Sequence, residues 1–325
     1  MGEAFAGKTV GKKAMLWGIL AQSIPDIDFV AAFWLPVQDN LLAHRGFTHS
    51  ILFALFLSPF IAAMAYRLHR PHNISFNKWL SFISAAMLGH IFLDAFNNYG
   101  VAWFEPFSHV RISFNSVYVV DPFFSLVPII AVLLLLTLRV KNRFRKKIWK
   151  IGLIIPLLYL IYGLGNKWYV TYETKKILAT KQVSYKRLLT TPAPLQSWLW
   201  FIAVEKDSGF YTSYRSVFDD KNNMKLFYFD RQQNLASKIY NKAELNKLIR
   251  FSQGFYTLEK RKDTLVLNDL RFGQITGWQS PYNGFAFYYY LQPSADNLLA
   301  VQRGRFANWN KYTFGSLVRR IQGER

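Results

Sequence analysis

The sequence predicts an α-helical, multi-pass membrane domain of four or five apolar helices, one of them broken, followed by a soluble α+β domain. Two observations carry this prediction. Residues 1–168 contain apolar runs that approach or reach the roughly 20 residues needed to cross a bilayer. From residue 169 onward the apolar runs shorten and charges occur every few positions. We therefore predict a membrane-embedded domain over 1–168 and an extracytoplasmic α+β domain, without an assigned role, over 169–325.

Four apolar runs in the first part are candidate membrane-spanning helices. Phe47–Tyr66 contains no Lys, Arg, Asp or Glu, and Trp79–Phe96 contains only Asp94. Asp121–Leu138 is apolar after its first residue, and Ile151–Gly165 is shorter. Runs of this kind are typical of transmembrane helices.

A fifth apolar stretch, Ala14–Leu35, is cut in half by the sequence Pro-Asp-Ile-Asp at 25–28. Irregular backbone at membrane depth is tolerated only where it is buried in protein or lines a cavity. We therefore predict a broken or re-entrant helix here.

Basic residues in short loops predict the orientation, because they favour the cytoplasmic side. Three basic clusters fall on one side of the membrane if every apolar run crosses it. That side is predicted to be cytoplasmic, with the C-terminal part on the outer side of the membrane. The clusters are Lys8, Lys12 and Lys13; Arg67, Arg70 and Lys78; and Arg139, Lys141, Arg143, Arg145, Lys146 and Lys147.

The second part combines strand-like and helix-like segments. Asn241–Phe251 and Trp309–Ile321 have the pattern of amphipathic helices. Five segments rich in aromatic and β-branched residues are predicted strands. They are Trp198–Val204, Phe210–Phe218, Lys225–Phe229, Asp263–Val266 and Phe285–Leu291.

The composition limits the chemistry. The chain has no cysteine, which excludes disulfides and thiolate ligands, so a metal site must use His, Asp or Glu. The net charge of +21 could indicate nucleic-acid binding. Because the basic residues flank long apolar runs, we predict the lipid bilayer as the partner and expect no nucleic acid.

Six ionisable residues lie inside or at the ends of the apolar runs, where such groups are costly and usually functional. His90 and Asp94 are four residues apart, so they share one face of a helix, a spacing that suits two ligands of one ion. On the predicted topology all six can meet near the outer surface. The six are Asp26, Asp28, His44, His49, His90 and Asp94.

These side chains predict a divalent-metal site, with zinc the first candidate and manganese the second. A bound metal lowers the pKa of water to about 7 and polarises a carbonyl or phosphoryl oxygen. Six candidate ligands are more than one zinc ion needs, so a site with two metal ions is an alternative. Asp26 or Asp28, if not bound to metal, is a candidate general base, and Arg45 is a candidate to hold an anionic oxygen.

The same residues also have ordinary structural explanations. Asp26 could cap a helix, and His44 could be a plain loop residue. His49 could hydrogen-bond to a neighbouring helix, while His90 and Asp94 could form an interhelical polar pair.

The motifs together resemble the YdjM-like family, whose members are described as membrane-bound metal-dependent hydrolases of bacteria and archaea. The resemblance rests on Pro-Asp-Ile-Asp at 25–28, His-Arg-Gly-Phe-Thr-His at 44–49, Gly-His-Ile-Phe-Leu-Asp at 89–94 and Asn-Asn-Tyr-Gly at 97–100. It covers roughly residues 1–140 and implies that the six matching positions are ligands.

The family is also distantly similar to zinc-dependent phospholipase C and P1-type nucleases, which implies phosphoester hydrolysis. Val-Asp-Pro at 120–122 matches the family as well, although Asp121, directly before Pro122, is predicted to N-cap a helix. One departure is that family members carry Thr-His shortly before Gly-Glu-Ala, which here directly follows Met1.

We therefore predict a multi-pass, metal-dependent hydrolase of the bacterial inner membrane that acts on a phosphoester or lipid-linked substrate at the outer membrane interface. The alternative is a non-catalytic membrane anchor, in which the cluster is structural and the α+β domain binds a partner. Replacing His90 by alanine separates them, because only the hydrolase then loses a chemical step.

Overall fold

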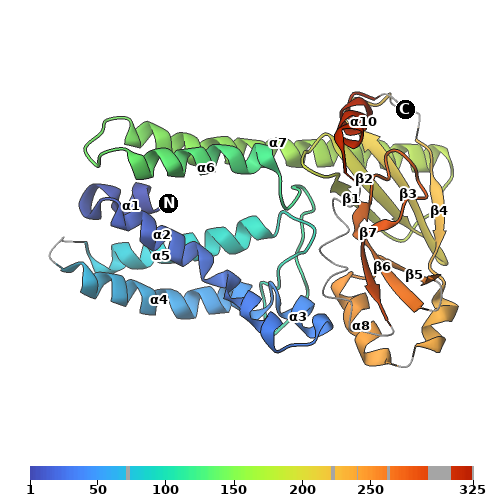
Figure 1. Cartoon of the computed structure of the whole chain (residues 1–325), viewed down its shortest axis with the longest axis horizontal. Coiled ribbons are helices and arrows are strands. Elements are labelled where there is room, and N and C mark those ends of the chain that lie inside the picture. Colours follow the sequence, from blue (N-terminus) through green and yellow to red (C-terminus); the bar gives the residue numbers. More distant parts are fainter. Residues whose placement is uncertain (71–73, 221–223, 240, 262–263, 292–308, 324–325) are drawn as a thin grey trace. The chain divides into compact units, whose positions relative to one another are not determined.

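The computed structural model describes residues 1–70, 74–220, 224–239, 241–261, 264–291 and 309–323. The chain forms two compact units, and the predicted order of a helical N-terminal half and a sheet-containing C-terminal half is confirmed (Figure 1). Unit 1 comprises Met1–Pro36, Leu42–Phe114 and Val120–Ile161, and unit 2 comprises Val37–Leu41, Asn115–Val119 and Tyr162–Arg325.

The first 180 residues are helical apart from their connections. The core of unit 1 centres on α5, whose Trp79 and Phe82 are buried beside Trp17 of α2 and Ala62 of α4. The elements are α1 (Gly2–Val10), α2 (Lys13–Ser23), the 3-10 helix η1 (Pro25–Phe33), α3 (Val37–Ala43), the 3-10 helix η2 (Phe47–His49), α4 (Ile51–Leu68), α5 (Phe76–Asp94), α6 (Pro122–Thr137) and α7 (Arg145–Thr180).

The described residues contain fewer candidate membrane spans than the four or five predicted. Helices α4 and α7 are long and apolar enough to cross a bilayer, and α2 with η1 makes a third if the bent pair is one span. Helix α6 is apolar but has only 16 residues. Helix α5 carries Asn77 and Lys78 at its start and His90 and Asp94 at its end, so it is polar at both ends.

The predicted break in the first apolar stretch is confirmed. Helix α2 ends at Ser23 and η1 begins at Pro25, and the two axes differ by 56°. Proline has no backbone N–H and its ring clashes with the preceding turn of a helix, so it favours a break at this point, although α4, α6 and α7 continue through Pro59, Pro128 and Pro156. The bend leaves Asp26 and Asp28 in a 3-10 turn at the end of the broken helix.

Asp121 caps α6, as predicted. Its carboxylate accepts hydrogen bonds from the backbone N–H groups of Phe123 (2.9 Å) and Phe124 (3.3 Å) and from the hydroxyl of Tyr159 on α7 (2.8 Å). We expect Asp121→Ala to lower the free energy of unfolding by about 1–2 kcal/mol, and Asp121→Asn to cost less because its amide oxygen can still cap. Thermal unfolding in detergent, followed by circular dichroism, measures the difference. Equal stability of both variants and the wild type would contradict this role.

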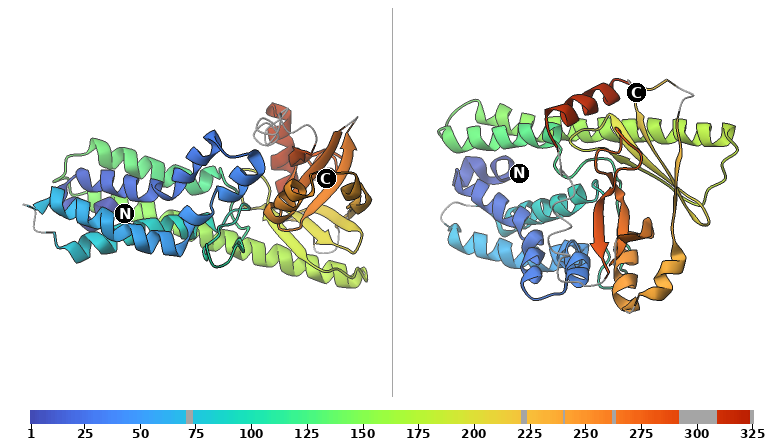
Figure 2. Two further views of the ribbon diagram at one scale, coloured as in Figure 1. Left: turned by 90° about the horizontal axis from the view of Figure 1, so that it is seen from below. Right: turned by 45° about the vertical axis from the view of Figure 1, so that its right-hand side comes forward.

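Unit 2 holds two antiparallel sheets with strand orders β1-β2-β3-β4 and β5-β6-β7 (Figure 2). The elements are β1 (Leu188–Pro192), β2 (Leu199–Glu205), β3 (Gly209–Ser216), β4 (Phe227–Asp230), the 3-10 helix η4 (Gln233–Lys238), α8 (Lys242–Phe251), β5 (Tyr256–Arg261), β6 (Thr264–Gln274), β7 (Phe285–Tyr290) and α10 (Lys311–Ile321).

The five predicted strands and both predicted helices of this unit are confirmed to within a few residues, except that β6 continues to Gln274. The first residue of that predicted strand, Asp263, lies outside the described residues. The prediction missed β1 and β5. Strand β1 ends in Pro192, which an edge strand tolerates, and β5 ends in the charged residues Glu-Lys-Arg at 259–261.

Candidate metal centre

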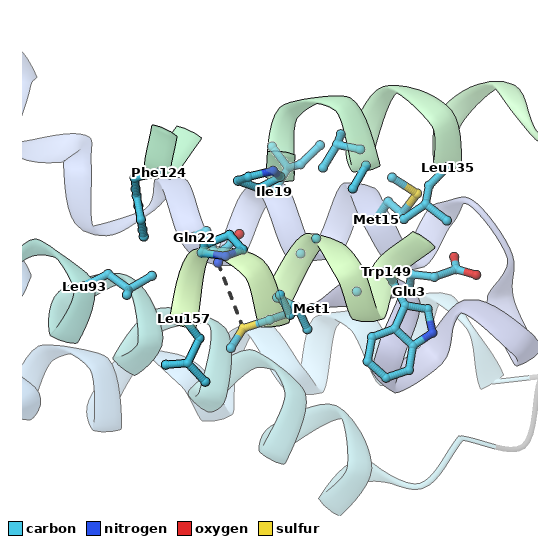
Figure 3. A pocket seen from close by; sticks show the side chains of 18 of the residues that line it. Met1, Glu3, Met15, Ile19, Gln22, Leu93, Phe124, Leu135, Trp149 and Leu157 are labelled. Atoms are coloured by element: carbon cyan, nitrogen blue, oxygen red, sulfur yellow. Dashed lines mark hydrogen bonds between the residues drawn. The ribbon is translucent and has the colours of Figure 1, made fainter. Parts of the chain in front are cut away.

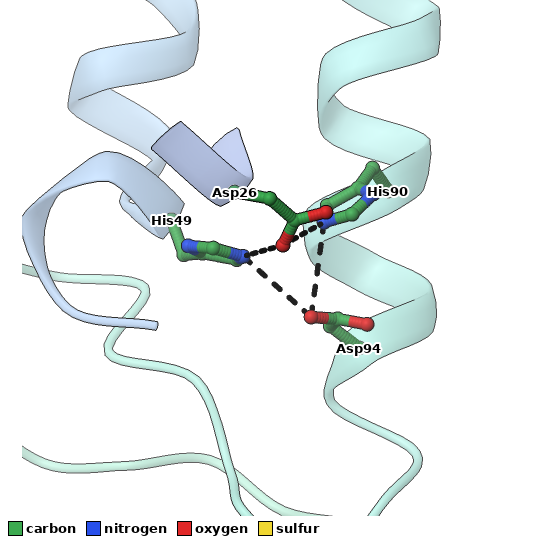
Figure 4. Close-up of side chains that lie close together, drawn as sticks. All are labelled: Asp26, His49, His90 and Asp94. Carbon is green, nitrogen blue, oxygen red and sulfur yellow. Dashed lines mark ion pairs between the residues drawn. The ribbon is translucent and has the colours of Figure 1, made fainter. Parts of the chain in front are cut away.

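Three segments far apart in the sequence bring four side chains with metal-binding atoms together (Figure 4). Asp26 lies in η1 just after the bend, and His49 is the last residue of η2, directly before α4. His90 and Asp94 lie on the last turns of α5, where their four-residue spacing puts them on one face. Because α4 packs along α5, the start of the first helix and the end of the second meet at this point.

The distances between these atoms suit a shared cation better than direct hydrogen bonds. His49 Nε2 lies 3.4 Å from Asp26 Oδ1 and 3.6 Å from Asp94 Oδ2. His90 Nε2 lies 3.5 Å and 3.7 Å from the same two oxygens. Hydrogen bonds from nitrogen to oxygen usually measure about 2.7–3.2 Å. Two ligand atoms bound tetrahedrally to one zinc ion, each about 2.0–2.1 Å from it, lie about 3.3 Å apart.

Unpartnered atoms support the same conclusion. Within the described part of the chain, His49 Nε2, His90 Nε2 and Asp94 Oδ2 are buried and have no hydrogen-bond partner. Asp94 Oδ2 is paired with Arg45 Nε at 3.1 Å, but the two neutral imidazole nitrogens have lost water without gaining a hydrogen bond, which costs about 1–3 kcal/mol for each. A cation between them removes that cost, so the four residues fit a divalent metal.

Asp28 and His44 lie beside this group rather than in it. Asp28 is buried, and its oxygens lie 3.1 Å from His49 Nδ1 and 3.0 Å from His44 Nδ1. The same carboxylate accepts hydrogen bonds from the backbone N–H of Arg45 (2.7 Å) and the hydroxyl of Thr48 (3.2 Å). A carboxylate only accepts, so His49 donates from Nδ1 to Asp28, and its Nε2 is the atom that would bind a metal in place of a proton.

The charges around His49 demand a positive charge at this point. Burial alone lowers the pKa of His49, but the carboxylates of Asp26, Asp28 and Asp94 around it raise that pKa to about 10. Opposite charges within a few ångströms stabilise the charged form of a group. Without a metal, a proton on His49 balances part of the negative charge of these three carboxylates. A divalent cation can balance more of it.

Arg45 adds a cationic group at the edge of the centre. Its Nε lies 3.1 Å from Asp94 Oδ2, and its guanidinium lies 5.1 Å from the ring centroid of Tyr99. The buried Nη1 has no hydrogen-bond partner among the residues that the structure describes. The backbone of Arg45 has a φ of 57°. Residues other than glycine rarely adopt this conformation, and those that do are concentrated at functional sites.

The structure thus brings together Asp26, His49, His90 and Asp94, and sets the other two predicted ligands next to His49. Two further contacts were missed at the sequence level. They come from Thr48, which binds Asp28, and Tyr99, which faces Arg45. Both lie inside the motifs that carried the resemblance, which is the signal that could have identified them.

Asp28→Asn is expected to weaken metal binding by about 10–100-fold, because it removes the carboxylate that orients His49. Competition with a chelator of known affinity measures the change. Asp39→Asn is the matched control, because Asp39 pairs with Lys247 outside the centre. Equal affinity of both variants would contradict the orienting role of Asp28.

Comparisons with known proteins agree with the helical part of this description. Residues 1–169 match the model of the family described as YdjM inner membrane protein. The chain is 37% identical over 112 residues to the uncharacterized protein YfhP of Bacillus subtilis (strain 168) and 29% identical over 113 residues to the inner membrane protein YbcI of Escherichia coli (strain K12).

Each match covers 34% of this chain, together with 32% of YfhP and 64% of YbcI, so less than two thirds of either relative is spanned. No solved structure matches. Since the family model matches more than half of its residues, the chain belongs to the YdjM inner membrane protein family.

Proposed function

We propose that this chain is a metal-dependent hydrolase of the inner membrane that acts on a phosphoester. The observation that carries the proposal is the convergence of buried ligand atoms on His49, His90 and Asp94 beside Arg45 Nη1, which has no hydrogen-bond partner among the described residues. The first set suits a divalent cation and the second suits an anionic oxygen. Both kinds of group stabilise the charge that develops in phosphoester hydrolysis.

Asp26 then has two proposed tasks, and the other residues have one each. Asp26, His49, His90 and Asp94 hold the metal, with zinc as the first candidate and manganese as the second. When bound, the metal supplies Lewis acidity, which lowers the pKa of water and polarises a phosphoryl oxygen. Arg45 binds a second phosphoryl oxygen through Nη1 and so stabilises the charge that builds up during attack.

The two aspartates differ in their accessibility. The side chain of Asp28 is only 4% exposed and is engaged by His44 and His49, which makes it a positioning residue. The side chain of Asp26 is 48% exposed. The Asp26 oxygen that is not directed at His49 is therefore the proposed general base, taking the proton of the attacking water.

Exposed apolar side chains around the centre support a place at the membrane interface. Phe29, Phe33 and Trp34 lie in or just after η1, and Phe47 lies just before His49, and all four are exposed. Tryptophan concentrates where a membrane meets water, and exposed phenylalanine side chains can enter the hydrocarbon beside it. We propose that the chain crosses the membrane several times, with the metal centre at the outer interface and the C-terminal unit on the extracytoplasmic side.

The test is an assay of the full chain in lipid nanodiscs, loaded with zinc or manganese, on soluble and lipid-borne phosphate esters. Metal-dependent release of phosphate or a phosphorylated headgroup is expected for the wild type. That activity is lost in His90→Ala and kept in His109→Ala, whose exposed imidazole pairs with Glu105 away from the centre. A metal-loaded protein that is inert on the whole panel contradicts the proposal and favours the anchor alternative.

A further inference from the structure

Unit 1 contains a cavity of about 550 Å³ between α1, α2, the end of α5, α6 and the first half of α7 (Figure 3). Pockets that hold small ligands usually measure about 300–1,000 Å³. The lining is almost entirely apolar, with Gln22 and Glu3 as its main polar residues. Apolar cavities of this kind hold apolar ligands in preference to water.

One end of the cavity lies at the level of the metal centre. Gln22, Leu93, Phe124 and Leu157 lie toward this end in Figure 3. Leu93 directly precedes Asp94 on α5, and Gln22 lies one helical turn before Asp26. The lining residues Gln22 and Leu93 are therefore close in sequence to Asp26 and Asp94, which do not line the cavity themselves.

The opposite end is formed by Glu3, Met15, Leu135 and Trp149 (Figure 3). Glu3 is held there by Arg145, whose Nε and Nη2 donate hydrogen bonds of 2.8 Å and 2.6 Å to its two carboxylate oxygens. This buried ion pair satisfies the charge at that end. The stretch between the two ends is apolar.

The walls of the cavity remain accessible from outside the protein. Ile19, Leu153 and Leu157 line it and are still 49%, 41% and 56% exposed. The adjoining surface of α6 is also apolar and exposed, at Ile129 and Leu133. In a membrane these surfaces face hydrocarbon, so an acyl chain can enter sideways without crossing water.

We propose that this cavity binds the acyl chain of a phospholipid whose phosphate lies at the metal centre. This inference rests on the proposed function for the position of the phosphate, and it names a lipid phosphoester as the substrate class. The continuity of the cavity with the apolar outer face of α6 favours a bilayer lipid as the occupant, and Arg45 with the metal ligands supplies the charges that a phosphate needs.

The test uses photoactivatable phosphatidic acid, with the reactive group in its acyl chain, and the full chain in nanodiscs. Labelled peptides are mapped by mass spectrometry. We expect labelling at Val132 and Leu153 in the wild type. Ile19→Trp fills the cavity, whereas Leu20→Trp adds the same bulk to the neighbouring exposed position, which does not line it. Because the indole of Ile19→Trp occupies the space proposed for the acyl chain, labelling at Val132 and Leu153 is expected to be lost in Ile19→Trp and kept in Leu20→Trp.

Two further arms separate this inference from the proposed function. Labelling requires no turnover, so cavity labelling in a protein that hydrolyses nothing supports the lipid site and contradicts only the hydrolase. Hydrolysis of hexadecyl and ethyl phosphate at equal kcat/KM, without cavity labelling, keeps the hydrolase and overturns the lipid site. Equal labelling by photoactivatable diacylglycerol, which lacks phosphate, also overturns the proposal, because the cavity would then select only for hydrocarbon.

Discussion

Replacing His90 and Asp94 together by alanine is expected to abolish metal retention by the purified protein. The pair supplies two of the four converging ligand groups, and a divalent ion held by the remaining two, Asp26 and His49, is not retained through purification. Elemental mass spectrometry of the detergent-purified protein measures metal per chain. The wild type is expected to hold the metal in a stoichiometric amount.

The control variant is His109→Ala, which removes an exposed histidine that pairs with Glu105. Circular dichroism of all three proteins separates loss of the ligands from loss of the fold. No metal in the wild type, even after loading with zinc and manganese, would make the cluster a polar network between helices. The anchor alternative would then become the leading one.

Arg45→Met is expected to lower kcat/KM for a phosphoester substrate by about 10²–10³-fold, while metal content stays at the wild-type level. The change removes the unpartnered Nη1 that is proposed to stabilise developing negative charge. Arg45→Lys keeps the charge but not the planar fork, so it is expected to recover only part of the loss.

Arg143→Met is the matched control, because Arg143 is exposed and contacts only the ring of Phe144 in the described structure. Arg45 also pairs with Asp94, so metal content is measured in every variant. A parallel loss of metal and activity in Arg45→Met would show that Arg45 acts through Asp94. Unchanged kinetics with metal bound would remove it from the proposed mechanism.

Much of the N-terminal architecture follows from local rules. The bend between α2 and η1 lies at Pro25, which removes a backbone hydrogen bond and so favours a break in the helix. The shared face of His90 and Asp94 comes from the helical repeat, and the cap at Asp121 comes from its place before a helix-starting proline. Each of these features depends on residues within about one turn, so the sequence alone was enough to predict it.

The number of candidate membrane spans could not be predicted correctly from the sequence. Hydropathy marks α5 and α6 as apolar, but it does not show where a helix ends or which face is covered by protein. Helix α5 buries its middle against α2 and α4, and α6 stops after 16 residues. Strands β1 and β5 were missed for a similar reason, since their partners β2 and β6 stabilise sequences with weak strand character of their own.

The division of labour between Asp26 and Asp28 was decided only by the tertiary structure. In a 3-10 helix residues two apart point in different directions, so one carboxylate faces His90 and the other faces His44. The sequence by itself determined which residue types could bind a metal and that they would lie at the ends of apolar helices. Which of them converge depends on how η1, η2 and α5 pack, because ligands from three distant segments meet only when their helices are placed together.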